Sequence, residues 1–235
     1  MASPVLTLFS YFRSSCSYRV RIALNLKGVP YVTVPVNLHA GAQREAEYAL
    51  KNPGKKVPTL VVGDTPISQS VAILEFLEES PPFEGKEPRL MPSRDDPVKR
   101  AAVRVLCGQI GCDIQPVANL SVLRRVSALS RHFGQTAEIA ESEGKKWAKE
   151  TIEEGFEVVE TQLKETAGTF AVGDKETLAD VYLLPQVYNA KRFGIDVAQS
   201  FPRIAKVSDT FSKIPAVLAA HPHRQPDCPP ELREQ

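Results

Sequence analysis

The chain has 235 residues, enough for one large domain or two smaller ones with sizeable cores. A hydrophobic content of 43% and a charged content of 24% are ordinary for a soluble globular protein. The net charge of +1 gives no bulk attraction to nucleic acid or to an anionic membrane, which argues against a polyanion-binding protein. No apolar run reaches membrane-spanning length and no leader pattern is present, so we expect no membrane association and a reducing, cytoplasmic compartment.

The first eighty residues alternate between strand and helix patterns, and no internal repeat interrupts them. In chain order we expect an apolar strand over 5–12, a helix over 15–27 that ends at Gly28, a strand over 30–38, a short polar helix over 41–51, a hairpin over 57–68 and a helix over 68–80 with Ser68 as N-cap. The order β-α-β-α-β-β-α, with parallel early strands and an antiparallel hairpin at the edge, is thioredoxin-like.

The segment 80–97 carries five prolines and many charges, which is typical of a linker. Helical patterns follow: one apolar face carries Val98, Ala101, Ala102 and Val105, and residues 143–166 form a long amphipathic run. Thr177 and Asp180 have the spacing of a capping box at a helix start. We therefore expect an α/β domain over 1–82, a proline-rich linker over 83–97 and an all-α helical bundle over 98–235 with an irregular C-terminal tail.

The stretch Ser14-Ser15-Cys16-Ser17-Tyr18-Arg19 stands where the first strand meets the first helix. A helix N-terminus has unpaired N–H groups and partial positive charge, so it stabilises an anion. Three interpretations are open: Cys16 is itself a reactive thiolate, a serine hydroxyl holds the thiolate of a ligand, or a serine only caps the helix. The four cysteines form no CxxC pair and the four histidines have no ligand spacing, so no metal is expected.

Two further dipeptides are unusual for their positions. Pro58 lies within the sheet-forming region, and a cis Val57–Pro58 bond would turn the N–H and C=O of Val57 outward, toward a peptide-like ligand. Gln69 and Ser70 begin a helix, where an amide, a hydroxyl and open N–H groups suit a carboxylate. Helix capping and an ordinary turn explain the same residues equally simply. Together, the three segments describe a cradle for a small thiol peptide, namely glutathione.

The sequence resembles the zeta class of the glutathione transferase superfamily over nearly its whole length. The motifs that carry the resemblance are YFRSSCSYRVRIALNLKG, NPGKKVPTL, ISQSVAILEFLEE, IQPVANLSVL, GDKETLADVYLLPQVYNAKRF and HPHRQPDCP. Tyr18 departs from the tryptophan that many members carry. The resemblance implies the glutathione transferase architecture, with glutathione as cofactor, and a homodimer.

The resemblance also implies a set of site residues. Ser14, Ser15 and Cys16 would form the catalytic motif, with Ser15 as the donor to the glutathione thiolate and Cys16 as a dispensable neighbour. Arg192 would face the substrate, with Arg13 as a second positive partner and Arg19 as a further candidate. The residues implied to bind glutathione are Ser14, Ser15, Cys16, Ser17, Tyr18, Arg19, Gln43, Val57, Pro58, Gln69, Ser70, Gln115, Asn119, Leu120 and Ser121.

The activity implied is the glutathione-dependent cis–trans isomerisation of maleylacetoacetate to fumarylacetoacetate in phenylalanine and tyrosine catabolism. A transferase side activity on small α-haloacids is implied as well, because the same thiolate displaces halide. Two alternative functions remain for the same fold. One is a Cys16-based thiol–disulfide or dehydroascorbate reductase, and the other is a non-catalytic glutathione-binding scaffold.

Overall fold

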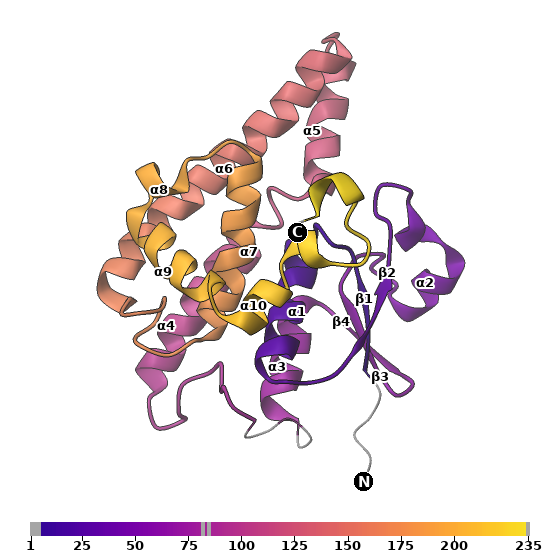
Figure 1. Cartoon of the computed structure of the whole chain (residues 1–235). Helices are drawn as coiled ribbons and strands as arrows, with labels where there is room; N and C mark the ends of the chain where they lie inside the picture. Colours follow the sequence, from indigo (N-terminus) through magenta and orange to yellow (C-terminus); the bar gives the residue numbers. More distant parts are fainter. Residues whose placement is uncertain (1–5, 81–82, 84–85, 234–235) are drawn as a thin grey trace. The chain divides into compact units, whose positions relative to one another are not determined.

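The computed structural model describes residues 6–80, 83 and 86–233, so predictions that fall on the remaining positions, including parts of the expected first strand and linker, lie outside the described residues. The chain divides into two compact units, Met1–Leu90 with Ser212–Gln235, and Met91–Phe211. The first combines strands with helices and the second is helical, as the sequence predicted (Figure 1). The described part contains no helix that is both long and apolar enough to cross a membrane.

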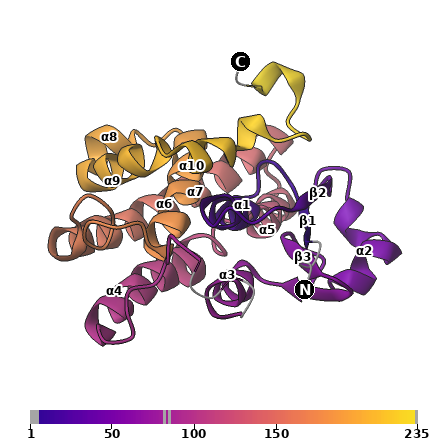
Figure 2. The same cartoon turned by 60° about the horizontal axis from the view of Figure 1, so that its bottom comes forward.

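The first unit has the predicted thioredoxin-like element order. Its elements are β1 (Leu6–Ser10), α1 (Ser15–Leu26), β2 (Val32–Pro35), the 3-10 turn η1 (Ala42–Arg44), α2 (Ala46–Lys51), β3 (Thr59–Val62), β4 (Thr65–Ser68) and α3 (Ser70–Glu79). The strands lie in the order β2-β1-β3-β4, with β1 parallel to β2 and antiparallel to β3, and β3 antiparallel to β4. Helices α1 and α3 cover one face of this sheet and α2 lies on the other (Figure 2).

Apolar periodicity explains why these segments take these forms. Leu6 and Leu8 of β1 point into the core at alternate positions, and α1 buries Val20, Ile22 and Leu24 completely. Full burial of each such side chain contributes about 1.5–3 kcal/mol of transfer free energy. The sheet and its helices are therefore held by a continuous apolar core.

The prediction that Ser68 caps the third helix is wrong. Ser68 pairs with Thr59 as the last residue of β4, which keeps its backbone extended, and the N-cap of α3 is Gln69. The expected helix over 41–51 is also divided, because Glu45 is extended and separates η1 from α2.

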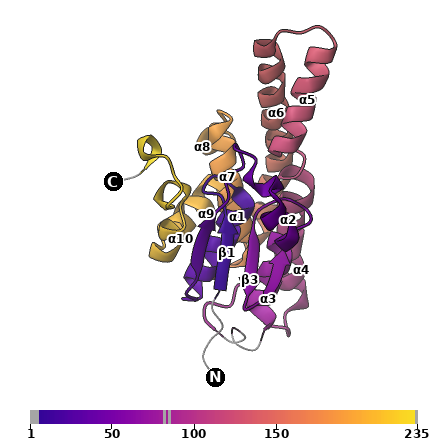
Figure 3. The same cartoon turned by 90° about the vertical axis from the view of Figure 1, so that its right-hand side faces the viewer.

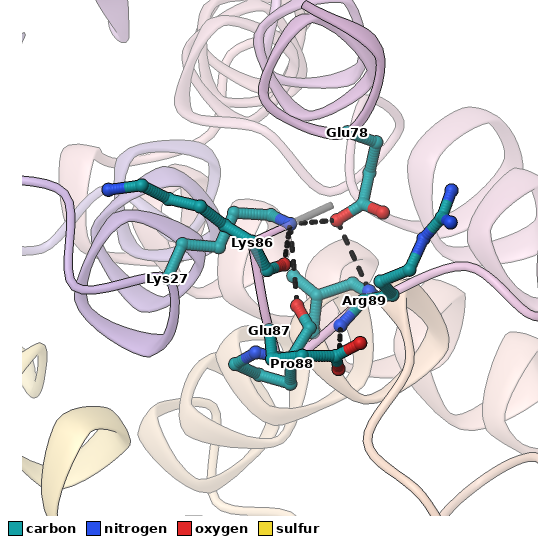
Figure 4. A network of polar contacts seen from close by, with 7 residues as sticks. Lys27, Glu78, Lys86, Glu87, Pro88 and Arg89 are labelled. Carbon is teal, nitrogen blue, oxygen red and sulfur yellow. Dashed lines mark hydrogen bonds and ion pairs between the residues drawn. The ribbon is translucent and has the colours of Figure 1, made fainter. Parts of the chain in front are cut away.

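A buried ion pair fixes the end of this unit that leads into the linker. Lys27 at the end of α1 lies 2.7 Å from Glu78 of α3, and both side chains are almost fully buried. The same ammonium donates to the carbonyl oxygens of Lys86 and Pro88, and Glu78 accepts from the N–H of Leu90 (Figure 4). A buried charge pair is tolerated only when its remaining hydrogen bonds are satisfied, which is the case here.

The C-terminal segment belongs to the first unit, although the sequence analysis grouped it with the helical part. It contains α10 (Pro215–Ala219) and the short turns η3 (Pro222–Arg224) and η4 (Pro230–Leu232). Helix α10 packs against α1, where Asn25 donates to the carbonyl oxygen of Ala216 at 3.0 Å. These contacts lie far apart in the sequence, which is why local patterns did not reveal them.

The second unit consists of α4 (Pro97–Gly108), a π-helical turn η2 (Gln109–Ile114), α5 (Leu120–His132), α6 (Ala137–Thr166), α7 (Leu178–Arg192), α8 (Val197–Ser200) and α9 (Pro202–Ser212). Helices α5 and α6 run antiparallel, side by side, over the length of α5 (Figure 3). The amphipathic pattern of α6 is confirmed by the residues that it buries, namely Ala140, Gly144, Ala148, Ile152, Phe156, Val159 and Leu163.

The apolar face expected on α4 is not the face that this helix buries. Val98 is 79% exposed and Val105 47% exposed, whereas Val103 and Leu106 are buried. Within one chain, α4 therefore keeps part of its apolar surface in contact with water.

Candidate active site

The register of the sheet brings the three predicted ligand segments of the first unit to one end. Phe9 of β1 pairs with Thr59 of β3, and Thr59 pairs with Ser68 of β4. These paired residues mark one end of the sheet, where β1 and β4 end and β3 begins. The residues that follow β1, precede β3 and follow β4 therefore all lie at this end. These residues are Ser14–Arg19, Val57–Pro58 and Gln69–Ser70.

At the start of α1, the two adjacent serines have different roles. Ser14 is the N-cap, and its Oγ accepts a hydrogen bond from the N–H of Ser17 at 3.2 Å. Ser15 is the first helical residue, only 5% exposed, and its hydroxyl makes no hydrogen bond to the described residues. The capping role that the sequence left open thus falls to Ser14, and the hydroxyl of Ser15 remains available to a ligand.

The next residues of α1 support this end of the helix. Cys16 is a half-buried thiol in the first turn, next to Ser15. Ser17 is fully buried, and its hydroxyl has no hydrogen-bond partner among the described residues. The Tyr18 ring is buried and lies edge-on to the ring of His221, 6.1 Å away, so this aromatic residue packs the tail against α1.

The Val57–Pro58 peptide bond is cis. Neither the N–H nor the C=O of Val57 is hydrogen-bonded to another described residue. The preceding loop is held rigidly: Tyr48 Oη donates to the carbonyl oxygen of Lys56 at 2.6 Å, and Asn52 Nδ2 donates to the same oxygen at 2.7 Å. Val57 is therefore presented as a fixed donor and acceptor pair, the arrangement with which an extended peptide pairs.

The start of α3 is open and carries a buried positive charge beside it. Gln69 adopts φ +71°, a conformation that side-chain-bearing residues seldom take, and its side chain does not cap the helix. The first N–H groups of α3 are thus left for an anion. Arg19, 2% exposed, donates from Nη1 to Ser70 Oγ at 3.4 Å. This arrangement favours a carboxylate at Gln69 and Ser70.

Gln43 and Arg13 each have a buried polar atom without a partner among the described residues. Gln43 lies in η1, beyond β2, whose last residue Pro35 pairs with Ser10 at the same end of the sheet. Its Oε1 is buried and unpaired. The Arg13 guanidinium lies 5.4 Å from the ring of Phe12, and its buried Nε is unpaired as well.

The remaining predicted residues lie in the helical unit. Gln115 follows the π-helical turn, and Asn119 is the N-cap of α5 without a capping hydrogen bond from its side chain. Leu120 and Ser121 form the exposed first turn of the same helix. Arg192 is exposed at the end of α7, where Nη1 donates to Asn189 Oδ1 at 3.2 Å.

Four residues that hold the backbone next to the site segments were not predicted from the sequence. Arg21, fully buried, donates from Nη2 to the carbonyl oxygen of Phe12 at 3.0 Å. Asp227 accepts from the N–H of Phe12 at 2.8 Å, and Tyr48 and Asn52 hold the loop before Val57. The one available signal was Arg21, a charged residue among the apolar residues of α1.

The fold and this site define a class of enzyme. Residues 4–79 match the model for the glutathione S-transferase N-terminal domain, and residues 126–220 match the model for the C-terminal domain of the same family. A maleylacetoacetate isomerase from Rattus norvegicus is 46% identical over 228 residues, which cover 96% of each chain. The chain belongs to the glutathione S-transferase family.

Solved structures narrow the assignment within that family. A maleylpyruvate isomerase described as a bacterial zeta-class glutathione S-transferase superposes with a TM-score of 0.84 at 37% identity, covering 95% of this chain and 100% of the other. A maleylacetoacetate isomerase from Anaeromyxobacter dehalogenans with glutathione bound in its active site gives a TM-score of 0.81 at 39% identity, with coverage of 97% and 100%. These similarities place the chain in the zeta class.

Proposed function

We propose that this protein is an enzyme that isomerises maleylacetoacetate to fumarylacetoacetate with glutathione as cofactor. The single observation that carries the proposal is the hydroxyl of Ser15, a residue only 5% exposed, which has no hydrogen-bond partner among the described residues and lies at the positive end of α1. The relatives named maleylacetoacetate isomerase support the same reaction, since they match almost the whole chain.

The residues of the first unit fit glutathione. The hydroxyl of Ser15 suits the thiolate, the unpaired backbone groups of Val57 suit a peptide unit, and the open start of α3 beside Arg19 suits a carboxylate. The buried, unpaired Oε1 of Gln43 adds an acceptor at the same end of the sheet. A related enzyme holds glutathione in its active site, and this supports glutathione as the cofactor here.

When bound, glutathione would supply a thiolate nucleophile for the cis double bond of the substrate, and reversible addition would permit rotation about that bond. Ser15 donates a hydrogen bond that stabilises negative charge at the start of α1, and the open N–H groups of the first turn act in the same direction. Because the substrate carries a carboxylate at each end, Arg13 and Arg192 are proposed as its positive partners. The group at Cys16 plays no necessary part.

The test is isomerisation of maleylacetone, a stable analogue of the substrate, by the purified protein with and without reduced glutathione. We expect turnover only when glutathione is present, with the glutathione concentration unchanged at the end of the reaction. Turnover without glutathione, or no turnover at all, would contradict the proposal.

The same thiolate should displace halide from small α-haloacids. Ser15 stabilises the attacking group in both reactions, and the carboxylate of such an acid suits the same arginines. A relative from Anaeromyxobacter dehalogenans was solved with dicarboxyethyl glutathione and citrate in its active site, which supports a site for conjugates of small acids. Chloride release from a 2-chloro acid, measured with and without glutathione, tests this activity.

We also propose that the protein is a homodimer. The supporting observation is the apolar surface that one chain leaves in water on α4, where Val98 is 79% and Val105 is 47% exposed. Sedimentation of the wild type and of the double variant Val98→Asp/Val105→Asp tests the proposal. We expect a dimer that the charged variant dissociates, and a monomeric wild type would contradict it.

We place the enzyme in the cytoplasm, within phenylalanine and tyrosine catabolism. The support is chemical: the reaction needs reduced glutathione, which the cytosol maintains. Cell fractionation with an antibody to the protein tests the location. Accumulation of maleylacetoacetate derivatives after loss of the protein tests the pathway.

A further inference from the structure

The turn that leads into Ser15 is fixed by residues far along the chain. Phe12 is 3% exposed, and its N–H donates to Asp227 Oδ2 at 2.8 Å, across 215 positions. Its carbonyl oxygen accepts from Arg21 Nη2 at 3.0 Å. Both backbone groups of the residue at the centre of this turn are thus held by buried or half-buried charged side chains.

A hydrogen bond within the same turn connects its backbone to Ser14. The N–H of Ser14 donates to the carbonyl oxygen of Tyr11 at 3.0 Å, and Arg21 Nη1 lies 3.5 Å from that oxygen and 3.1 Å from Ser10 Oγ. A displacement of Phe12 would therefore move Ser14, and with it the first turn of α1. Active-site groups must be held within fractions of an ångström to be effective.

The tail presents Asp227 from a rigid turn of its own. Arg233 donates to the carbonyl oxygens of Pro226 and Cys228, which flank Asp227, at 2.9 Å and 3.0 Å. Cys228 is 2% exposed, and its N–H donates to the carbonyl oxygen of Gln225 at 3.0 Å. Asp227 is therefore held in one place relative to the tail.

The tail is attached to the same end of the sheet that carries the site. Cys228 belongs to an apolar cluster that also contains Tyr11, Phe12 and Val57. Arg21 Nε donates to the carbonyl oxygen of Ala220 at 3.1 Å, so this buried arginine links the turn to the start of the tail as well. One cluster thus joins the tail to the turn before Ser15 and to the residue that offers its backbone to a ligand.

The carboxylate of Asp227 is only partly satisfied. Its Oδ1 is buried and has no hydrogen-bond partner among the described residues, a costly arrangement for a group with no role beyond stability. We propose that Asp227 is a positioning residue for the thiolate site: by accepting from the Phe12 N–H, it sets where the Ser15 hydroxyl meets the sulfur of glutathione. The inference rests on the proposed function, because it assigns that sulfur to Ser15.

The test compares three variants of the full chain. Asp227→Ala removes the acceptor, Asp227→Asn keeps an acceptor oxygen without charge, and Glu231→Ala removes an exposed carboxylate from the same tail as a matched control. With maleylacetone as substrate, we expect Asp227→Ala to lower kcat/KM by roughly tenfold, the order expected for one lost hydrogen bond. The acid limb of its pH profile should move to higher pH, since a misplaced Ser15 stabilises the thiolate less. Asp227→Asn should remain within about threefold of the wild type, and Glu231→Ala should match it.

An unchanged pH profile in folded Asp227→Ala, or equal losses in the alanine and asparagine variants, would overturn the proposal. If Asp227→Ala does not fold, Asp227→Glu, which moves the acceptor outward by one methylene, must shift the pH profile. A wild type without glutathione-dependent turnover would refute the proposed function alone. Calorimetric titration with glutathione in buffers of different ionisation enthalpy would then still test the positioning role, which requires Asp227→Ala to release fewer protons on binding than the wild type, because it stabilises the bound thiolate less.

Discussion

The N-termini of α7 and α3 show two opposite ways to begin a helix. At α7, Thr177 and Asp180 form a complete capping box, and Asp180 Oδ1 also accepts from the N–H of Ala171 at 2.7 Å. At α3, Gln69 gives no side-chain cap and takes a left-handed backbone conformation. At α7 the side chains of Thr177 and Asp180 both have hydrogen-bond partners in the second unit, whereas the start of α3 has no side-chain cap for its N–H groups.

This difference separates structural helix starts from binding ones. An uncapped, strained helix start costs stability, and such costs are found where a ligand later supplies the missing partner. The start of α1 lies between the two extremes, because Ser14 caps it and Ser15 does not. Substitutions at the start of α7 should therefore affect stability, and those at the start of α3 should affect activity. At α1, substitution of Ser14 should affect stability and substitution of Ser15 should affect activity.

The largest effect is expected for Ser15→Ala. Removing one preorganised donor to developing negative charge lowers turnover by roughly 10²- to 10³-fold. Glutathione-dependent isomerisation of maleylacetone measures the loss, and thermal unfolding should change little. Cys16→Ala is the matched control and should keep a good part of the activity. The reverse order, with Cys16→Ala inactive and Ser15→Ala active, would favour a cysteine-based mechanism instead.

The next largest effect is expected for the pH dependence of stability that Asp180 causes at the start of α7. Burial raises the pKa of Asp180 to about 6 from 3.8, despite the hydrogen bonds that it accepts from Ala171 and Thr177. The folded protein therefore keeps this proton between pH 4 and 6, where the unfolded chain has released it. The contribution of Asp180 to stability is greatest below pH 4 and decreases as the pH rises through 6, by on the order of a few kcal/mol.

Denaturant unfolding of the wild type and of Asp180→Asn at several pH values measures this effect. Because asparagine does not titrate, the wild type minus variant difference in unfolding free energy should fall between pH 4 and 6 and then level off. A difference that rises with pH would mean that the hydrogen bonds to Asp180 outweigh its burial.

A smaller effect is expected for Ser14→Ala. Loss of an N-cap serine lowers the unfolding free energy by about 1 kcal/mol. Since Ser15 keeps its hydroxyl, the variant should retain much more activity than Ser15→Ala. Ser200→Ala, an exposed serine at the end of α8, is the control and should unfold like the wild type. Equal activity losses at Ser14 and Ser15 would show that the two serines act as one unit.

Local patterns predicted those parts of the molecule that local physics determines. The order of strands and helices along the first unit, the start of α1 at Ser15 and the capping box of Thr177 and Asp180 all follow from periodicity and from residues three or four positions apart. The contact between Phe12 and Asp227 could not be predicted in this way, because no periodic pattern joins residues 215 positions apart.

The errors have a common physical origin in tertiary context. Ser68 has the chemistry of an N-cap, but its pairing with Thr59 keeps it in the sheet. The apolar face of α4 follows helical spacing correctly, yet burial is decided by what packs against a helix, and Val98 remains 79% exposed within one chain. The candidate site residues could be proposed from the sequence because serine, glutamine and proline are conspicuous at element boundaries, whereas the buried residues that support them are not.

The smallest effect on stability is expected for Gln69→Gly. This variant also separates a structural helix start from a binding one most directly. Glycine adopts φ +71° without strain, so the unfolding free energy should stay constant or rise by less than about 1 kcal/mol. Glu75→Gly, in the exposed interior of the same helix, should instead lower it by about 1 kcal/mol. Gln69→Gly should nevertheless raise the KM for glutathione, because it removes the amide next to the proposed carboxylate site. If Gln69→Gly is more stable than the wild type but binds glutathione more weakly, the strained backbone at Gln69 serves ligand binding. An unchanged KM for glutathione would contradict a binding role for the open start of α3.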